Sequence, residues 1–274
     1  MPPILKPRRI SKQLALRIKI ELAIVRWTTH LFPFFTLFWL YSMCIDFSST
    51  QLYIFIFFMY ALGINTSAFM HRAWCHRAWI PDRWLNICAM IFHVFGCTGK
   101  TTTWAAVHRK HHRYTDTDKD PHSPYYKGKL YVMFALYDME FPKDLELYSK
   151  DLIKDPMHKW FSDYYWIINF GVWTILAIIN IQWLILWLAI IGFHIFKNKS
   201  FNVVGHNDPS TRESTNSLFW AYMYMHGEPW HKNHHLDPNN WRFKKKWYEP
   251  DLSADVIQLF CWLGWGKIRS FERG

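Results

Sequence analysis

Residues 164–196, YYWIINFGVWTILAIINIQWLILWLAIIGFHIF, decide how this chain meets a membrane. At about 1.5 Å per residue, a single helix over this run would extend about 50 Å. That length is well beyond the roughly 30 Å of a bilayer's hydrocarbon core. The polar residues Asn180 and Gln182 interrupt the run near its middle. We therefore predict a tight hairpin of two membrane spans here rather than one crossing.

Two earlier apolar runs, 27–45 and 52–69, each approach the roughly 20 residues that a membrane helix needs. The link between them, 46–51, carries one acidic and no basic residue, which indicates an external loop. The first run is too long for a cleavable signal peptide and lacks a small-residue cleavage site. Basic residues gather before it, as is typical of the cytoplasmic side: Lys6, Arg8, Arg9, Lys12, Arg17 and Lys19.

The composition agrees with a chain that is partly buried in lipid. It has 17 Trp, 22 Phe and 14 Tyr, and Trp and Tyr are enriched at membrane interfaces. The five cysteines include no CxxC pair, so they predict no disulfide framework and fit a reducing compartment. The formal net charge of +11 would suit nucleic acid, but no nucleic-acid-binding motif accompanies it. We expect no nucleic-acid partner.

One histidine pattern occurs twice, as His108-Arg-Lys-His111-His112 and as His231-Lys-Asn-His234-His235. Residues three and four apart are neighbours on a helix surface, so each copy presents three imidazoles on nearly one stripe. Neutral imidazole is the commonest protein metal ligand. A single copy can be an exposed, solvated stretch, but the repeat favours a metal site.

Three further side chains extend this set. His71 and His76 lie where the second membrane helix should end; a spacing of five places them about 140° apart on an ideal helix, so they converge only if the helix ends or bends. His206 is a ninth candidate, and Asn202 lies one turn before it, where an amide can orient a bound water. The remaining histidines are interpreted as structural or surface residues: His30, His93, His122, His158, His194 and His226.

A single metal site requires all these histidines on one side of the membrane, and two crossings within 164–196 satisfy that requirement. For the same reason the short apolar stretch 86–98 should lie in the interface as an amphipathic or re-entrant helix. The predicted fold class is an all-α integral membrane protein with four transmembrane helices and a cytoplasmic histidine-rich helical cap. The histidine clusters at 71–76, 108–112 and 231–235 are called the histidine boxes below.

The predicted organisation has both termini and all the boxes on the cytoplasmic side. Its segments are a basic N-terminal segment 1–26, a first transmembrane hairpin 27–69, a cytoplasmic segment 70–160 with the first two boxes, a second transmembrane hairpin 161–199 and a cytoplasmic segment 200–274 with the third box.

The number and type of these ligands restrict the chemistry. Nine imidazoles exceed the four ligands of a zinc site and suit two ions of five or six coordination. Without thiolate or carboxylate ligand motifs, the favoured metal is iron. A redox metal at a membrane surface suggests oxygen chemistry on a lipid-like substrate.

The boxes resemble those of the membrane fatty-acyl desaturases, the stearoyl-CoA desaturase-like family. The matching stretches are HRAWCHRAW at 71–79, WAAVHRKHHRYTDTDKDPHSP at 104–124, NVVGH at 202–206 and HGEPWHKNHH at 226–235. The similarity covers about 25–240. It implies a water held near one iron by Asn202, and two irons bound by His71, His76, His108, His111, His112, His206, His231, His234 and His235.

The resemblance also implies an activity: insertion of a double bond, at the delta-9 position, into a saturated acyl chain with O2 and two external electrons. The chain would be linked to CoA, carrier protein or lipid. A separate donor such as ferredoxin or a b-type cytochrome would supply the electrons, since no fused cytochrome domain is apparent. Trp104 matches a family position near a bend of the acyl tunnel. Arg72, Arg109 and Arg113 would pair with carboxylates or with the polar head of the substrate, or would be ordinary cytoplasmic surface charge.

Two alternatives share part of this pattern. A membrane di-iron fatty-acid or alkyl hydroxylase could use the same ligands, and a metal- or haem-handling membrane protein would use histidines without catalysis. The residues before the first box, Phe69 and Met70, and the stretch YYKGKLYVMFALYDMEF after 124 depart from the family pattern. These departures leave the head group and the double-bond position open. The basic run 242–246 would suit an acidic donor, acidic lipids or a solvated face.

Overall fold

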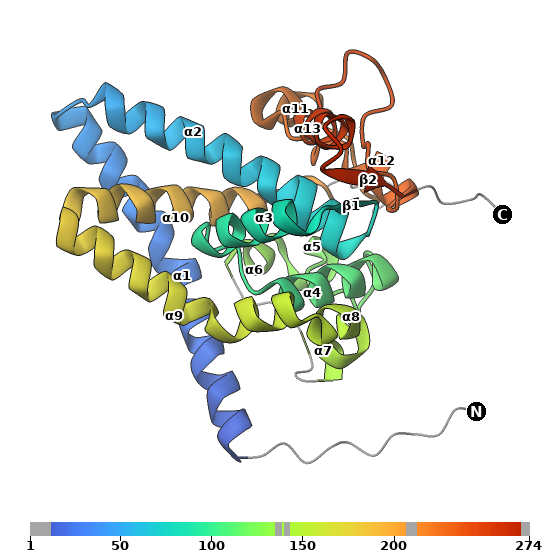
Figure 1. The fold of residues 1–274 in the computed structure, drawn as a ribbon, viewed down its shortest axis with the longest axis horizontal. Coiled ribbons are helices and arrows are strands. Elements are labelled where there is room, and N and C mark those ends of the chain that lie inside the picture. Colours follow the sequence, from blue (N-terminus) through green and yellow to red (C-terminus); the bar gives the residue numbers. More distant parts are fainter. Residues whose placement is uncertain (1–11, 135–138, 140–142, 207–212, 270–274) are drawn as a thin grey trace.

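The computed structural model describes residues 12–134, 139, 143–206 and 213–269. Within these ranges most of the chain is helical and very little is strand (Figure 1). Its one two-stranded sheet pairs β1 (Trp79–Pro81) with β2 (Gly266–Ile268) in antiparallel register, Trp79 opposite Ile268. The prediction of an all-α membrane protein with four spans and a histidine-rich helical cap is confirmed.

Five elements make up the membrane-spanning part: α1 (Lys12–Ile45), α2 (Ser49–Asn65), the π-helix η1 (Thr66–Cys75), α9 (Pro156–Ile179) and α10 (Ile181–Val204). Among the described residues, four candidate spans are long and apolar enough to cross a bilayer: Lys19–Ile45, Ser49–Cys75, Pro156–Ile179 and Ile181–Val204. The first begins earlier than the predicted 27–45, and the second ends later than 52–69 because η1 continues α2 without a break.

The predicted hairpin in 164–196 is confirmed, and Asn180 makes its turn. The backbone of Asn180 is extended, with φ −169° and ψ 125°, which ends α9. Its side-chain oxygen accepts a hydrogen bond from the backbone N–H of Gln182 at 2.8 Å, so that Asn180 caps the N-terminus of α10. Asparagine is a preferred residue at this position, which explains why one polar residue is enough to reverse the chain.

The helices α1 and α10 pack closely at one point. Gly192 has no side chain, and a Cβ there would lie 2.1 Å from the backbone oxygen of Phe32. Next to this contact, the hydroxyl of Thr36 donates to the carbonyl of Ala189 at 2.8 Å. Small residues allow membrane helices to approach this closely, so Gly192 sets the crossing of the first and fourth spans.

The shorter helices lie together at the end of the spans opposite the two turns at 45–49 and 179–181, where they form the cap (Figure 1). They are α3 (Arg83–Phe95), α4 (Thr101–Tyr114), α5 (Pro124–Lys127), α6 (Lys129–Phe134), α7 (Lys143–Tyr148), α8 (Lys150–Lys154), α11 (Leu218–Tyr224), α12 (His231–Leu236) and α13 (Leu252–Trp262). The division of the chain at 26, 69, 160 and 199 stays a prediction.

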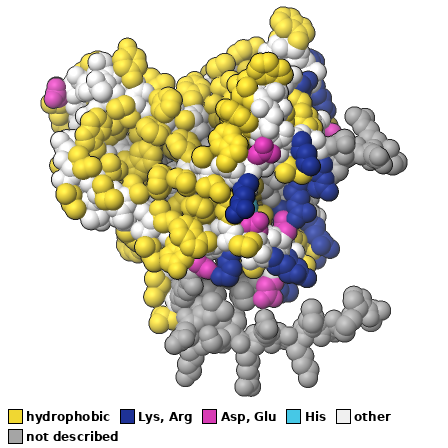
Figure 2. All heavy atoms as spheres, in the orientation of Figure 1, with side chains coloured by type: hydrophobic (Ala, Val, Ile, Leu, Met, Phe, Trp, Pro, Cys, Tyr) yellow, Lys and Arg dark blue, Asp and Glu magenta, His cyan; other side chains and the backbone are white. Residues whose placement is uncertain are grey.

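The stretch predicted to be an amphipathic helix is α3. Met90 and His93 are buried on one of its faces, whereas Trp84, Ile87 and Ile91 are exposed on the other. This pattern suits a helix that lies along an interface. In Figure 2, hydrophobic side chains dominate the surface of the spans and Lys and Arg gather along one edge of the cap.

Candidate metal centre

The structure brings all nine predicted histidines together in two groups. The larger group contains His71, His76, His108, His112 and His234. The smaller group contains His111, His206, His231 and His235. Within each group the potential ligand atoms lie within 4.8 Å of one another. Each group thus has enough imidazoles for one metal ion.

The π-helix η1 explains how His71 and His76 converge. A π-helix has hydrogen bonds between residues five apart, and here the backbone N–H of His76 donates to the carbonyl of His71 at 3.1 Å. Residues five apart therefore stand about one turn apart, and the two ring centroids are 5.0 Å apart. The separation expected on an ideal α-helix does not apply, because the turn is wider.

Each copy of the HxxHH pattern serves both groups. On α4, His108 and His112 belong to the larger group and His111 to the smaller. On α12, His234 belongs to the larger group, and the other two histidines of the motif belong to the smaller. The two helices therefore lie across both groups, and neither presents its three rings to a single ion.

The Nε2 atoms of these rings face one another at hydrogen-bond distance. The separations are 3.0 Å for His71–His234, 2.8 Å for His76–His108, 2.9 Å for His112–His234, 2.9 Å for His206–His231, 3.1 Å for His231–His235 and 3.3 Å for His111–His235. A neutral imidazole has one N–H, so a ring that donates through Nδ1 has only a lone pair at Nε2.

Three carboxylates fix which nitrogen carries that proton. Glu228 accepts from Nδ1 of His71 at 2.7 Å. Asp120 accepts from Nδ1 of His111 at 2.8 Å, and Asp116 from Nδ1 of His206 at 2.7 Å. The Nε2 lone pairs of these three rings then point at the Nε2 atoms of His234, His235 and His231. A cation among the nitrogens would satisfy them, and a carboxylate on the outer nitrogen is the usual arrangement around metal-bound histidines.

Sequence reasoning missed these carboxylates, although all three lie in the quoted stretches: Asp116 and Asp120 in TDTDKD, and Glu228 in HGEP. His122, which is predicted to be a structural or surface residue, lies beside the centre. Its ring stacks on that of His111 with the centroids 4.2 Å apart, and it forms a third compact group with His111 and Asp120.

Burial favours the neutral form of seven of these imidazoles. It lowers the pKa of six rings well below the ordinary 6.5, and neighbouring histidines lower it further: His76, His108, His111, His112, His231 and His234. For His235, burial and the same kind of neighbours lower the pKa to about 2. Neutral imidazole is the form that binds metal, so the site favours ligation over protonation.

Three other predicted site residues lie around this centre. The ring of Trp104 stacks on His108, with the centroids 5.0 Å apart, and meets His71 edge-on at 5.8 Å. Asn202 is half-buried on α10, one turn before His206. Arg113 is exposed, and its guanidinium lies 5.7 Å from the ring centroid of Tyr114.

Arg109 pairs with a carboxylate inside the protein, which is the first of the alternatives predicted for it. Its guanidinium donates to both oxygens of Asp151, at 2.6 and 3.0 Å, and to the backbone carbonyls of Trp74 and Cys75. These contacts join α4 to α8 and to the end of η1. The donors that would have met a substrate head group are therefore engaged with the fold.

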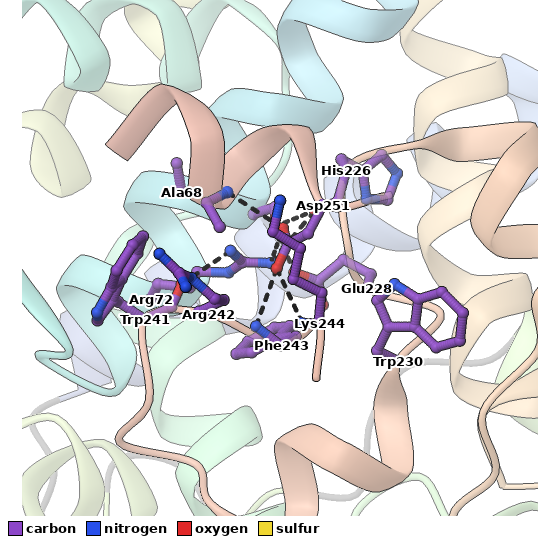
Figure 3. A network of polar contacts seen from close by, with 12 residues as sticks. Ala68, Arg72, His226, Glu228, Trp230, Trp241, Arg242, Phe243, Lys244 and Asp251 are labelled. Atoms are coloured by element: carbon purple, nitrogen blue, oxygen red, sulfur yellow. Dashed lines mark hydrogen bonds and ion pairs between the residues drawn. The ribbon is translucent and has the colours of Figure 1, made fainter. Parts of the chain in front are cut away.

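Arg72 is buried and also pairs with a carboxylate (Figure 3). It donates to Asp251 at 2.9 Å and to the carbonyl of Trp241 at 2.9 Å. Its guanidinium lies 3.8 Å from the centroid of the Phe243 ring. The same phenyl ring contacts His234, at 4.5 Å between centroids. Arg72 thus contacts the phenyl ring that packs against His234, and its guanidinium does not point into the histidine centre.

Asp251 gathers the C-terminal segment around this arginine (Figure 3). One carboxylate oxygen accepts from Arg72 and from the backbone N–H of Ala254, which caps α13. The other accepts from the backbone N–H groups of Phe243 and Lys244. This one side chain therefore ties α13 and the segment after the third box to η1.

Comparison with known proteins agrees with this centre. The model of the family described as Fatty acid desaturase matches residues 48–249. The chain is 27% identical over 225 residues to the Delta-9 desaturase-like 5 protein of Arabidopsis thaliana, covering 76% of this chain and 73% of that protein. It is 25% identical over 210 residues to the sn-1 stearoyl-lipid 9-desaturase of Anabaena variabilis, covering 74% and 77%. A third relative, the sn-2 palmitoyl-lipid 9-desaturase of Nostoc sp., is 24% identical over 234 residues, covering 81% and 82%.

Proposed function

This chain belongs to the fatty acid desaturase family, and we propose that it inserts a delta-9 double bond into a saturated acyl chain with two irons, O2 and two external electrons. It is a membrane oxidoreductase. The observation that carries the proposal is the pair of buried histidine groups whose Nε2 atoms converge while carboxylates hold Nδ1. Iron fits this donor set because the ligands are neutral imidazoles with no thiolate among them.

Each residue has a definite part in this proposal. The five histidines of the larger group would hold one iron, and the four of the smaller group the other, where Asn202 would hold a water. When bound, the irons would supply the oxidation by O2 that removes two hydrogens from neighbouring methylenes. Glu228, Asp116 and Asp120 keep three rings oriented. Trp104, packed against His71 and His108, would position the acyl chain beside the centre.

The names of the relatives favour a lipid-linked substrate. Two of the proteins above are named stearoyl-lipid and palmitoyl-lipid desaturases, and we infer that this chain acts on acyl chains of membrane glycerolipids rather than on CoA or carrier-protein thioesters. Arg113, exposed on α4, is the one predicted arginine that we retain for the head group. A separate ferredoxin or b-type cytochrome would supply the electrons.

The cap should face the cytoplasm. The residues before the first span carry the basic run Lys6 to Lys19, whereas the turns at 46–48 and 180 at the other end of the spans carry no basic residue. Lysine and arginine mark the cytoplasmic side of membrane proteins. Both termini and the metal centre are therefore proposed to be cytoplasmic, where reduced electron carriers are available.

The activity can be tested by expression in a host with a defined lipid profile and a compatible electron donor. Mass spectrometry of separated lipid classes, with double-bond localisation, should find a new delta-9 monoene in glycerolipids. A hydroxy fatty acid instead would favour the hydroxylase alternative, and a monoene confined to acyl-CoA would contradict the lipid-linked substrate. An iron-loaded protein that forms no product with any donor would overturn the proposal.

The ligand assignment can be tested with one residue from each group. His111→Ala and His234→Ala should each abolish desaturation and lower the iron content per protein, because each removes one imidazole from its histidine group. His30→Gln is the matched control, because His30 is exposed on α1 in the first span. Full activity in either alanine variant would show that the group concerned does not bind the reactive metal.

A further inference from the structure

The helix between His206 and the third box has an apolar face that no described residue covers. On α11, Leu218, Phe219, Tyr222 and Met223 are 56%, 65%, 53% and 51% exposed. These positions are spaced by one and four residues, so they share one side of the helix. The opposite side is packed: Ala221 is fully buried. The exposed face is therefore not a frayed end but the outer side of a docked helix.

A neighbouring loop extends this face and adds positive charge. Trp247 is 93% exposed, the largest exposed fraction among the exposed large hydrophobic side chains, and Lys245 and Lys246 beside it are exposed. The hydroxyl of Tyr222 donates to the backbone carbonyl of Tyr248 at 2.9 Å, which joins the loop to α11. The apolar side chains, the indole and the two lysines thus form one surface, called the α11 surface below.

The helix α11 adjoins the membrane-spanning part through the side that does not carry the exposed face. The ring of Tyr224 on α11 packs against Phe201 near the end of the fourth span, with the centroids 5.1 Å apart. Figure 1 shows α13 beside the end of α2 that leads into η1, with α11 next to α13 in this view. In Figure 2, hydrophobic side chains cover both the spans and this part of the cap. The α11 surface therefore continues the lipid-facing surface.

We propose that the α11 surface lies in the membrane interface, as a second docked element besides α3. The aliphatic and aromatic side chains would enter the boundary between head groups and acyl chains, Trp247 would lie at head-group depth, and Lys245 and Lys246 would meet lipid phosphates. A soluble acidic partner would match the lysines but not the apolar face. A bilayer matches both the lysines and the apolar face. It would also lie next to α11, because α11 packs against the end of α10, which is a candidate membrane span.

This position has a consequence for the metal centre. The helix α11 lies in the chain between His206 and His231, whose Nε2 atoms are 2.9 Å apart in the smaller histidine group. Docking of α11 in the membrane interface would therefore fix the position of the segment that joins these two ligands. The inference rests on α10 being a membrane span and not on the proposed reaction, and its test needs no activity measurement.

The test measures the depth of a fluorescent label in lipid nanodiscs. In a Cys44→Ser, Cys88→Ser background, which removes the two exposed cysteines, Phe219→Cys would carry a bimane label. The matched control is Asn239→Cys, at an exposed polar position in the loop after α12. Met223→Cys is a second position on the same face, in case the first variant does not fold.

Lipids brominated in their acyl chains should quench the labels at 219 and 223 several-fold more than the label at 239. Aqueous iodide should show the reverse order. Equal quenching at all three positions by either agent would overturn the proposal. Protection of 219 from iodide without quenching by brominated lipid would also overturn it. Energy transfer between labelled copies at 219 would then identify a second copy of the chain as the occupant.

Discussion

At the scale of single residues, Glu228 shows how the fold sets the tautomer of a ligand. One carboxylate oxygen accepts from His71 Nδ1 at 2.7 Å and the other from the hydroxyl of Ser67 at 2.6 Å. Burial would raise the pKa of Glu228, but His71 and Arg72 outweigh it and lower that pKa to about 2. The carboxylate is thus charged, and it holds His71 with Nε2 toward the centre.

Glu228→Gln should therefore weaken metal binding while leaving the fold in place. The amide keeps the shape but loses the negative charge that polarises His71. Losing such an outer partner typically costs about 10–100-fold in metal affinity. The measurement is iron per protein after dialysis against graded chelator. Glu213→Gln, at an exposed carboxylate that pairs with Lys232, should retain the wild-type curve. Superimposable curves for Glu228→Gln and wild type would contradict the role assigned to Glu228.

Asp151 gives the expected pH dependence of stability. Burial would raise the pKa of Asp151, but hydrogen bonds and charges from Arg109 and Arg77 lower it from 3.8 to about 2. A carboxyl group whose pKa is lowered by folding stabilises the folded state at pH values above the pKa that it has in the unfolded chain. That contribution is lost as the pH falls from about 4 toward 2.

In thermal unfolding monitored by size exclusion, Asp151→Asn should melt below wild type at pH 6. The gap should narrow as the pH falls below 4, because wild-type Asp151 then becomes protonated too. Asp163→Asn is the control, since Asp163 pairs with Lys159 on the exposed side of α9 and such pairs contribute little. A gap for Asp151→Asn that stays constant down to pH 3 would show that its charge is not what stabilises the protein.

The sequence alone identifies the nine histidines that cluster in the structure, but it does not identify the carboxylates that bind three of them. Spacing on α4 and α12 makes the HxxHH motifs visible without any tertiary information. Glu228, in contrast, meets His71 across 157 residues, and Asp116 meets His206 across 90. For Arg72 and Arg109 the sequence leaves carboxylate pairing and head-group binding open, because their acceptors Asp251 and Asp151 are distant in the chain.

At the scale of elements, η1 marks the limit of helical-wheel reasoning. The long apolar run predicts a helix through 52–69, but it carries no sign that the helix widens at Thr66. The spacing of His71 and His76 matches the five-residue period of a π-helix, and this was the one available signal. Such wide turns are rare and frequent at functional sites, so a pair of ligands five apart is reason to consider one.

Gly192 permits a test of the contact between α1 and α10. Gly192→Ala should destabilise the protein, because its Cβ would lie 2.1 Å from the Phe32 carbonyl oxygen and force the spans apart. Gly171→Ala is the matched control in α9: a Cβ there meets no atom within 4 Å, and replacing a helical glycine by alanine typically gains about 0.5–1 kcal/mol. The melting temperature should therefore fall only for Gly192→Ala. Equal shifts in the two variants would mean that the close approach does not limit packing.

At the scale of the whole molecule, the parity of membrane crossings predicted the fold. All the histidine boxes must lie on one side of the membrane, and 164–196 is long enough for two crossings. These two conditions predict a hairpin, and the structure has one at Asn180. The arrangement of the cap was beyond this reasoning. Its helices are short, and their order in space depends on buried contacts such as that between Arg72 and Asp251, 179 residues apart.

The same parity predicts which positions a reagent can reach in intact cells. In the Cys44→Ser, Cys88→Ser background, Phe47→Cys in the turn between α1 and α2 should react with a membrane-impermeant maleimide from outside. Phe47 is 66% exposed there. Asn239→Cys in the cap should react only after permeabilisation, because four crossings place the cap on the side of the basic N-terminal segment. Reversed labelling would contradict the cytoplasmic orientation but keep the fold. Labelling of both positions from the same side would contradict the four-span arrangement itself, since Phe47 and Asn239 are separated by three of its crossings.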